Sequence, residues 1–374
     1  MTRALLLVLD SVGCGAAPDA ARYGDEGADT LGHIRRATGL RLPVLDALGL
    51  DAILGGAAPA GAAHGRMRPR ATGKDSTTGH WEIAGAAPAA PFATFDRFPD
   101  ALVRAIEEEA GVAFLGNVAA SGTAIIDELG AEHLRSGRPI LYTSADSVLQ
   151  VAAHEEVIPP RRLYALCEVA RRHADAWAIG RVIARPFEGT PGAFRRTARR
   201  HDFSMRPPRT VLDAITEAGR PVIGIGKTGD LFAGQGLGAS HPTASNAEGM
   251  ARTAALWEEM REGLVFTNLV DFDTLFGHRR DVAGYAGALA EFDAWLGGFL
   301  PACGPEDLVI LTADHGNDPT FRGTDHTREE VPLLVLHRGR RDALGTRDGF
   351  ADVAATLAGA FGLPPWPSGR SFLA

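Results

Sequence analysis

The residues best suited to chemistry fall into three short clusters of carboxylates, imidazoles and hydroxyls. The strongest covers residues 312–318 and 323–327, where Asp314 and His315 are followed by His326. Imidazole with carboxylate suits Mn, Zn or Fe, and additional carboxylates shift the preference toward Mn or Mg. A single histidine is more often structural than a ligand, but an Asp-His pair with a further His nearby favours a divalent metal site.

A second cluster, residues 271–280, holds Asp273 and His278 at a spacing that lets both face one ion. Together with Asp10, the candidate ligands exceed what one tetrahedral ion needs and match two ions. Two-metal sites stabilise the attacking and leaving oxygens in phosphoryl transfer. The alternative is a set of acids and histidines in surface loops.

The third cluster, residues 72–82, places Ser76, Thr77 and Thr78 directly after Lys74 and an Asp. A hydroxyl becomes nucleophilic at neutral pH when a base or a metal removes its proton. No Gly-x-Ser-x-Gly elbow is present, so metal activation is the better explanation, while helix capping is the structural alternative.

Lys74 and Lys227 are the only lysines in the sequence, since every other cation is Arg. An ammonium does not replace a guanidinium in a tight site, so we expect both lysines to be site residues. Residues 224–229 formally match G-x-G-x-x-G, but a loop is expected after them, and Pro221 stands where the Walker pattern needs Gly. Nucleotide binding at this segment is therefore disfavoured.

Apolar runs predict the strands that must position these groups, and amphipathic patterns predict helices between them. Strands are expected at 4–9, 139–142, 221–225, 264–273, 308–312 and 331–336, and helices at 99–110, 163–173, 245–262 and 282–300. This alternation predicts an α/β fold with a mostly parallel sheet flanked by helices. Functional groups gather at the carboxyl ends of such strands, and three of these strands are expected to end in Asp10, Asp273 and Asp314.

The length of 374 residues suits two domains. Ala/Pro-rich residues 85–91 and the Arg-Pro-Pro at 206–208 have the composition of hinges. We therefore expect a metal-binding catalytic core of residues 1–90 and 207–374, with residues 91–206 forming a smaller inserted α/β cap.

Composition excludes several classes of protein. The net charge of −8 argues against a nucleic-acid binder. No apolar run reaches the roughly 18 residues that cross a membrane, so no membrane partner is expected. Three scattered cysteines without metal spacing predict reduced thiols in a cytoplasmic protein.

Taken in order, segments spanning nearly the whole chain resemble the phosphopentomutases, a family of the alkaline phosphatase superfamily. They include LLLVLDSVGCGAAPDA, TGKDSTTGHWEIAG, YTSADSVLQVAAHE, IGRVIARPF, RRTARRHDFS, IGIGKTGDLF, LVDFDTLFGHRRDVAGY and LTADHGNDPTFRGTDHTREEVPLLV. TGHWE and GTDHTRE are the most specific of these, because the superfamily shares the metal ligands.

The resemblance implies an alkaline-phosphatase-like core, an inserted cap and two Mn²⁺ ions, with Mg²⁺ or another divalent ion as alternatives. One ion would be held by Asp10, Asp314 and His315, and the other by Asp273, His278 and His326. Ser76 would be the phosphorylated nucleophile and a metal ligand, with Lys74 also catalytic. Because the family usually has Thr at this position, Thr77 and Thr78 stay alternatives. The substrate would meet Ser144, Asp146, Arg181, Arg196 and Lys227.

The implied activity is isomerisation of ribose 1-phosphate, or 2-deoxyribose 1-phosphate, to the 5-phosphate in nucleoside salvage. It would proceed through a phosphoserine and a 1,5-bisphosphate, with glucose 1,6-bisphosphate or a similar sugar bisphosphate as activator. We expect a cytoplasmic enzyme with a pentose phosphate substrate and no obligate protein partner. Rival interpretations are a cofactor-independent phosphoglycerate mutase, a metal-dependent phosphatase or phosphodiesterase, and a non-catalytic phosphosugar-binding protein.

Overall fold

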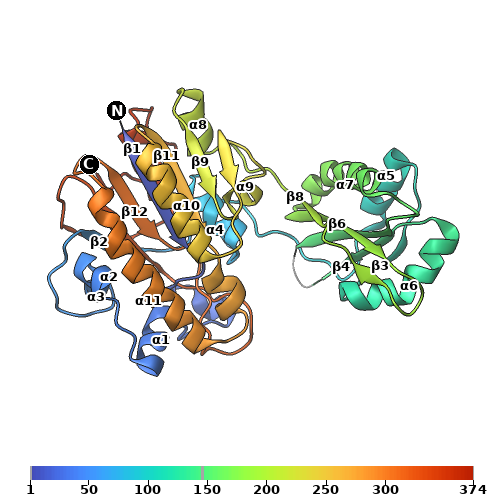
Figure 1. Ribbon diagram of the computed structural model, residues 1–374, viewed down its shortest axis with the longest axis horizontal. Helices are drawn as coiled ribbons and strands as arrows, with labels where there is room; N and C mark the ends of the chain where they lie inside the picture. Colours follow the sequence, from blue (N-terminus) through green and yellow to red (C-terminus); the bar gives the residue numbers. More distant parts are fainter. Residues whose placement is uncertain (1, 145–146, 374) are drawn as a thin grey trace. The chain divides into compact units, whose positions relative to one another are not determined.

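An eight-stranded sheet organises the larger part of the chain in the computed structural model, which describes residues 2–144 and 147–373. The chain divides into unit 1, Met1–Ala90 with Pro207–Ala374, and unit 2, Pro91–Arg206 (Figure 1). Each unit is a sheet with helices packed on it, so the predicted α/β class is confirmed.

The sheet of unit 1 is parallel over most of its width. Its strands, in spatial order, are β10 (Ala239–His241), β9 (Val222–Ile225), β11 (Gly263–Leu269), β1 (Arg3–Leu9), β12 (Leu308–Thr312), β13 (Val331–Leu336), β2 (Ala63–Met67) and β14 (Ala343–Arg347). The first five are mutually parallel, whereas β13 is antiparallel to both of its neighbours. β1, β11 and β12 are buried throughout almost their whole length, which explains their continuous apolar sequences.

Helices cover this sheet in two groups. They are α1 (Thr30–Thr38), α2 (Pro43–Leu48), α3 (Leu50–Ile53), α4 (Ser76–Ile83), α8 (Val211–Glu217), α9 (Thr228–Leu231), α10 (Asn246–Glu259), α11 (Val282–Phe299) and α12 (Asp352–Ala360). Single 3-10 turns lie at Ala20–Tyr23 and Leu300–Ala302, and a π-helical turn at Phe272–Gly277. Helix α11 contacts α1, α2 and α10, while α12 contacts α4 and α8. Figure 1 shows α10 and α11 in front of the sheet.

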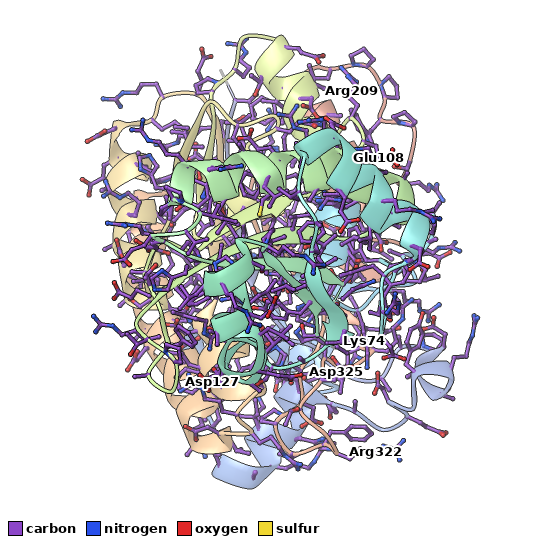
Figure 2. All side chains as sticks on the ribbon, turned by 90° about the vertical axis from the view of Figure 1, so that its right-hand side faces the viewer. Lys74, Glu108, Asp127, Arg209, Arg322 and Asp325 are labelled. Carbon is purple, nitrogen blue, oxygen red and sulfur yellow. The ribbon has the colours of Figure 1, made fainter. Side chains whose placement is uncertain are left out.

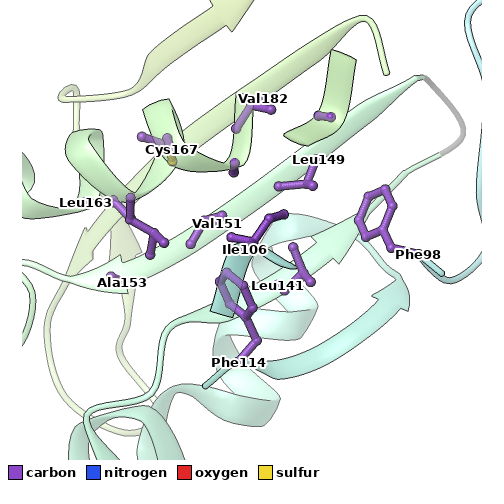
Figure 3. Packing of buried hydrophobic residues seen from close by; sticks show 14 of the residues in the cluster. Phe98, Ile106, Phe114, Leu141, Leu149, Val151, Ala153, Leu163, Cys167 and Val182 are labelled. Atoms are coloured by element: carbon purple, nitrogen blue, oxygen red, sulfur yellow. The ribbon is translucent and has the colours of Figure 1, made fainter. Parts of the chain in front are cut away.

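Unit 2 has a six-stranded sheet of its own. Its strands are β3 (Leu115–Ala119), β4 (Ile140–Thr143), β5 (Val148–His154), β6 (Arg181–Glu188), β7 (Arg195–Arg196) and β8 (His201–Ser204), and its helices are α5 (Asp100–Ala110), α6 (Gly122–Ser136), α7 (Pro160–Ala174) and the 3-10 turn Asp175–Trp177. Alternate residues of each strand face opposite sides of the sheet. Leu141 and Leu149 therefore join the core under α5 and α7 (Figure 3), while Ile140 and Tyr142 pack toward α6.

Two further observations bear on environment. No helix in the described part of the chain combines the length and the apolar character that crossing a membrane requires. Cys14, Cys167 and Cys303 are all free thiols, and burial raises the pKa of each.

Candidate active site

The candidate site lies where the parallel strands of unit 1 end. β11, β1 and β12 are adjacent and parallel, so their carboxyl ends meet at one edge of the sheet. Asp10 follows β1 directly, and Asp314 lies just beyond the end of β12. The expectation that Asp273 ends a strand is wrong, because β11 stops at Leu269 and Asp273 belongs to the π-helical turn that follows. Such turns occur frequently at functional sites.

Ser76 reaches the same edge at the start of helix α4. Asp75 caps this helix, since its carboxylate accepts the Thr78 N–H at 3.0 Å and the Thr78 hydroxyl at 2.6 Å. The Ser76 Oγ lies 3.3 Å from Asp10 Oδ1 and 3.2 Å from His315 Nε2. The cap therefore presents the first hydroxyl of the cluster to a carboxylate and an imidazole.

His315 faces two carboxylates. Its Nε2 lies 3.4 Å from Asp10 Oδ1 and 3.5 Å from Asp314 Oδ2, while its Nδ1 donates to the Gly316 carbonyl at 3.1 Å. Asp314 Oδ2 is buried and lies 3.0 Å from His80 Nδ1, whose N–H donates to the Ser76 carbonyl at 2.8 Å instead. Burial disfavours the charged form of His315, but the two carboxylates outweigh it and raise the pKa to about 10.

Asp273 faces two further imidazoles. His278 Nε2 lies 3.3 Å from its Oδ2, His326 Nε2 lies 3.3 Å from its Oδ1, and the two Nε2 atoms are 3.1 Å apart. The hydrogen bond to Asp273 raises the pKa of His278 to about 9. Burial disfavours ionisation of Asp273, yet the two histidines hold its pKa below the usual range.

These donors fit divalent ions. The His278 Nδ1–H donates to the Thr324 carbonyl at 2.7 Å, as His315 Nδ1 does to Gly316, so Nε2 is the ligand atom in both rings. Two groups have ligand atoms within 4.8 Å of one another: Asp273, His278 and His326; and Asp10, Asp273 and His315. Asp273 belongs to both groups, whereas the structure places Asp314 beside the second group through its approach to His315.

Arg328 anchors the loop that precedes the nucleophile. Its guanidinium pairs with both oxygens of Asp19 at 3.0 Å. It also donates to the carbonyls of Pro69, Ala71 and Gly73 at 3.0, 2.6 and 3.0 Å. Because Arg328 is only 2% exposed, the three bonds to carbonyls fix the loop backbone a few residues before Ser76.

Lys74 lies between two carboxylates of the same region. Its Nζ is 3.1 Å from Asp25 Oδ2 and 3.2 Å from Asp325 Oδ2, and Figure 2 shows Lys74 and Asp325 close together. Asp325 directly precedes the ligand His326. The ammonium thus links the nucleophile loop to the loop that carries one of the imidazoles.

Glu329 lies fully buried among three loops of the site. It accepts hydrogen bonds from the Thr30 N–H and hydroxyl, the Thr327 hydroxyl and the Gly15 N–H, at 2.9, 2.6, 2.6 and 3.1 Å. A Cβ on Gly316 would lie 2.4 Å from its Oε1, so a side chain at that position would displace it. Burial raises the pKa of Glu329 to about 7.

The remaining predicted substrate residues divide between the two units. Lys227 follows β9 at the carboxyl edge of the unit 1 sheet, and α9 begins directly after it, where a loop was expected. In unit 2, Ser144 follows β4, Arg181 begins β6, and Arg196 on β7 donates to a threonine hydroxyl. Asp146 lies outside the described residues.

Sequence reasoning missed three residues of unit 2 near Arg196, namely Tyr142, Arg185 and Arg200. The Tyr142 hydroxyl is buried close to Arg185. Burial raises the pKa of Tyr142, while Arg185, Arg196 and Arg200 oppose this shift through their positive charge. The arginine-rich segments quoted for the resemblance contained the signal for this basic cluster.

Comparisons with known proteins place these features in a family. A family model described as the Metalloenzyme superfamily matches residues 2–365. A phosphopentomutase from Anaeromyxobacter dehalogenans is 55% identical over 382 residues, covering 100% of this chain and 98% of that protein. A phosphopentomutase from Caldanaerobacter subterraneus subsp. tengcongensis is 51% identical over 383 residues, covering 100% and 98%. Among solved structures, Leishmania mexicana phosphoglycerate mutase is similar in fold, with a TM-score of 0.51 at 13% identity, covering 99% of this chain and 97% of that one.

Proposed function

Because the chain belongs to the phosphopentomutase family of the metalloenzyme superfamily, we propose that Ser76 carries the phosphoryl group that moves between C1 and C5 of a pentose. The enzyme class is that of an isomerase, as the sequence predicted. The position of the Ser76 hydroxyl supports this role, because its Oγ lies 3.2 Å from His315 Nε2 and 3.3 Å from Asp10 Oδ1. The Thr78 hydroxyl is instead buried and bonded to Asp75.

Two Mn²⁺ ions, or Mg²⁺ or another divalent ion, would bind the carboxylates and imidazoles around Ser76. One ion would take Asp10, Asp314 and His315, the other Asp273, His278 and His326, with Ser76 as a further ligand. Bound ions would supply the positive charge that favours the Ser76 alkoxide and neutralises phosphoryl oxygens. The Nε2 atoms that face the carboxylates, the buried carboxylates and the Asp314 oxygen that has no hydrogen-bond partner among the described residues all support this set.

The phosphoryl group would be transferred in two steps. Phospho-Ser76 passes its phosphoryl group to the free hydroxyl of a ribose or 2-deoxyribose phosphate, so that the serine O–P bond breaks as the sugar O–P bond forms. The sugar hydroxyl proton ends on the Ser76 oxygen, and a 1,5-bisphosphate results. Ser76 then attacks the other phosphoryl group of this intermediate, so that its sugar O–P bond breaks as the serine O–P bond forms again. The serine proton ends on the freed sugar oxygen, and the isomeric pentose phosphate is released. A sugar bisphosphate such as glucose 1,6-bisphosphate would supply the first phosphoryl group.

Unit 2 would act as the cap that protects this intermediate from water. A hydrolase-like site becomes a mutase only if water is excluded while the bisphosphate is held. Ser144, Asp146, Arg181 and Arg196 would bind the sugar and its distal phosphate, and Lys227 would add a cation from unit 1. The arginines around Tyr142 supply the charge that an anionic ligand needs.

Lys74 would support catalysis from the loop that carries Ser76. Its pairing with Asp25 and Asp325 favours a role in holding that loop against the His326 loop. The three free cysteines suit a reducing compartment, and we place the enzyme in the cytoplasm on that ground.

Peptide mapping of the phosphoenzyme tests the proposal. The protein is incubated with Mn²⁺ and glucose 1,6-bisphosphate, digested, and analysed by mass spectrometry. We expect phosphate on Ser76 in the wild type and no phosphopeptide in Ser76→Ala. Phosphate on Thr77 or Thr78 would move the nucleophile, and unmodified protein that nevertheless isomerises substrate would overturn the phosphoserine route.

A further inference from the structure

Two buried asparagines each donate a hydrogen bond to a carboxylate of the site. Asn268 lies near the end of β11 and is fully buried, and Asn317 follows β12 and is 1% exposed. Within the described part of the chain, neither side chain forms a hydrogen bond with the Ser76 hydroxyl. Their amides instead contact Asp10 and Asp273, which lie in the two different ligand sets proposed above.

Asn268 determines how the Asp10 carboxylate is turned. Residues 8 and 268 are paired in the parallel register of β1 and β11, and the Asp10 N–H donates to the Leu269 carbonyl at 3.1 Å. The Asn268 Nδ2 then donates to Asp10 Oδ2 at 3.1 Å. Because Oδ2 is held in this way, Oδ1 is the oxygen that faces Ser76 and His315.

Asn317 holds Asp273 in a similar way. Its own N–H donates to the Ser11 carbonyl at 3.1 Å and contacts the Thr30 hydroxyl oxygen at 3.2 Å, which fixes its backbone. Its Nδ2 donates to Asp273 Oδ1 at 2.8 Å. The approach requires glycine at position 277, since a Cβ there would lie 2.7 Å from Asn317 Cγ and Nδ2.

A contribution to folding stability does not explain well why position 268 has a buried asparagine. Its Oδ1 is buried without a hydrogen-bond partner among the described residues. A buried acceptor left in this state destabilises the folded protein, and an apolar side chain of similar size would avoid that cost. Asn268 has a buried unpaired oxygen that lowers stability, yet it bonds Asp10, a proposed metal ligand. Its effect on the Asp10 carboxylate is therefore the better explanation for an asparagine at this position.

We propose that Asn268 and Asn317 are positioning residues that orient Asp10 and Asp273 for divalent metal ions. The inference rests on the proposed ligand sets. Partners of this kind fix ligand orientation, and losing one typically weakens metal affinity by roughly 10–100-fold. Since Asp10 and Asp273 belong to different proposed ligand sets, loss of Asn268 should weaken the binding of one ion and loss of Asn317 the binding of the other.

The test is titration of the metal-free full chain with Mn²⁺ by isothermal calorimetry, with metal counted by mass spectrometry after gel filtration. The variants are Asn268→Leu and Asn317→Leu, with Gly277→Ala added to displace Asn317 without removing its amide. Thr267→Val is the matched control, because Thr267 is fully buried beside Asn268 and, among the described residues, its hydroxyl bonds only the Thr253 hydroxyl, at 2.8 Å.

We expect Asn268→Leu to weaken the binding of the ion held by Asp10 by roughly 10–100-fold, and Asn317→Leu and Gly277→Ala to weaken the binding of the ion held by Asp273 by a similar factor. Thr267→Val should bind Mn²⁺ as the wild type does. Leucine at position 268 removes the unpaired Oδ1 but also the donor to Asp10 Oδ2, so the melting temperature of the metal-free variant should change little while its metal affinity falls. A role in packing alone would lower the melting temperature and leave the affinity unchanged.

Unchanged affinity in the asparagine variants overturns the proposal. If a leucine variant does not fold by circular dichroism, Asn268→Ser and Asn317→Ser replace it, since serine is too short to reach the carboxylate. If the wild type binds no Mn²⁺, or binds it with the same affinity as Asp273→Asn, the proposed ligand sets themselves are wrong.

Discussion

Replacing Arg328 by Met should destabilise unit 1 and impair catalysis without touching a proposed ligand. The variant removes the pair with Asp19 and leaves the carbonyls of Pro69, Ala71 and Gly73 without their buried donor. Breaking a buried pair by removing one partner costs about 3–5 kcal/mol. Since Asp19 is partly exposed and water can hydrate it, we expect a loss near the lower end, about 3 kcal/mol.

Thermal unfolding with and without Mn²⁺ measures this loss. For a unit of this size, about 3 kcal/mol corresponds to a fall in melting temperature of roughly 6–12 °C. Arg338→Met is the matched control, because Arg338 pairs with Glu306 in solvent, and such pairs contribute at most about 1 kcal/mol. Hydrogen exchange of residues 69–75 should accelerate only in Arg328→Met. Equal melting temperatures for the two variants, with unchanged exchange, would refute the role assigned to Arg328.

Three further perturbations have defined outcomes. Ser76→Ala should abolish turnover while the protein still binds two metal ions; residual turnover would move the nucleophile to a neighbouring threonine. Burial raises the pKa of Glu329 from 4.5 to about 7, so the folded protein binds a proton that the unfolded chain releases, and this group's contribution to stability falls as pH rises between those values. Relative to Glu329→Gln, the wild type should therefore lose roughly 3 kcal/mol between pH 4.5 and 7 in urea titrations, and a constant difference would contradict this. Removing metal with a chelator should stop isomerisation and lower the melting temperature, and added Mn²⁺ should restore both; unaffected turnover would exclude a metal-dependent site.

The sequence predicted well those elements whose burial is complete. Residues 331–336 and 308–312 are strands in the structure at the bounds expected, because continuous apolar runs are what a strand buried on both faces requires. Strand β2 was missed, since its sequence AHGRM alternates in burial and contains a glycine and an arginine. The antiparallel direction of β13 could not be predicted either, because an apolar sequence pattern does not encode strand direction.

The assignment to the phosphopentomutases, predicted from motifs, is confirmed by similarity over the whole chain. The supporting contacts of the site were not predictable, because they join residues far apart in the sequence. The Ser11 N–H donates to the Asp314 carboxylate, and Arg328 bonds the backbone of the loop before Ser76. No local sequence pattern specifies which distant residues meet in this way. The motif letters of GTDHTRE contained Arg328 and Glu329, but only the fold shows what they contact.

The most direct test of the function is conversion of ribose 1-phosphate to ribose 5-phosphate by purified protein with Mn²⁺. It is run with and without glucose 1,6-bisphosphate, and free phosphate is measured in parallel. We predict rapid isomerisation that the bisphosphate stimulates and a chelator stops, with little free phosphate. Release of phosphate without isomerisation would contradict the mutase assignment and indicate a metal-dependent phosphatase, and the role of unit 2 as a cap would be the first part to fail.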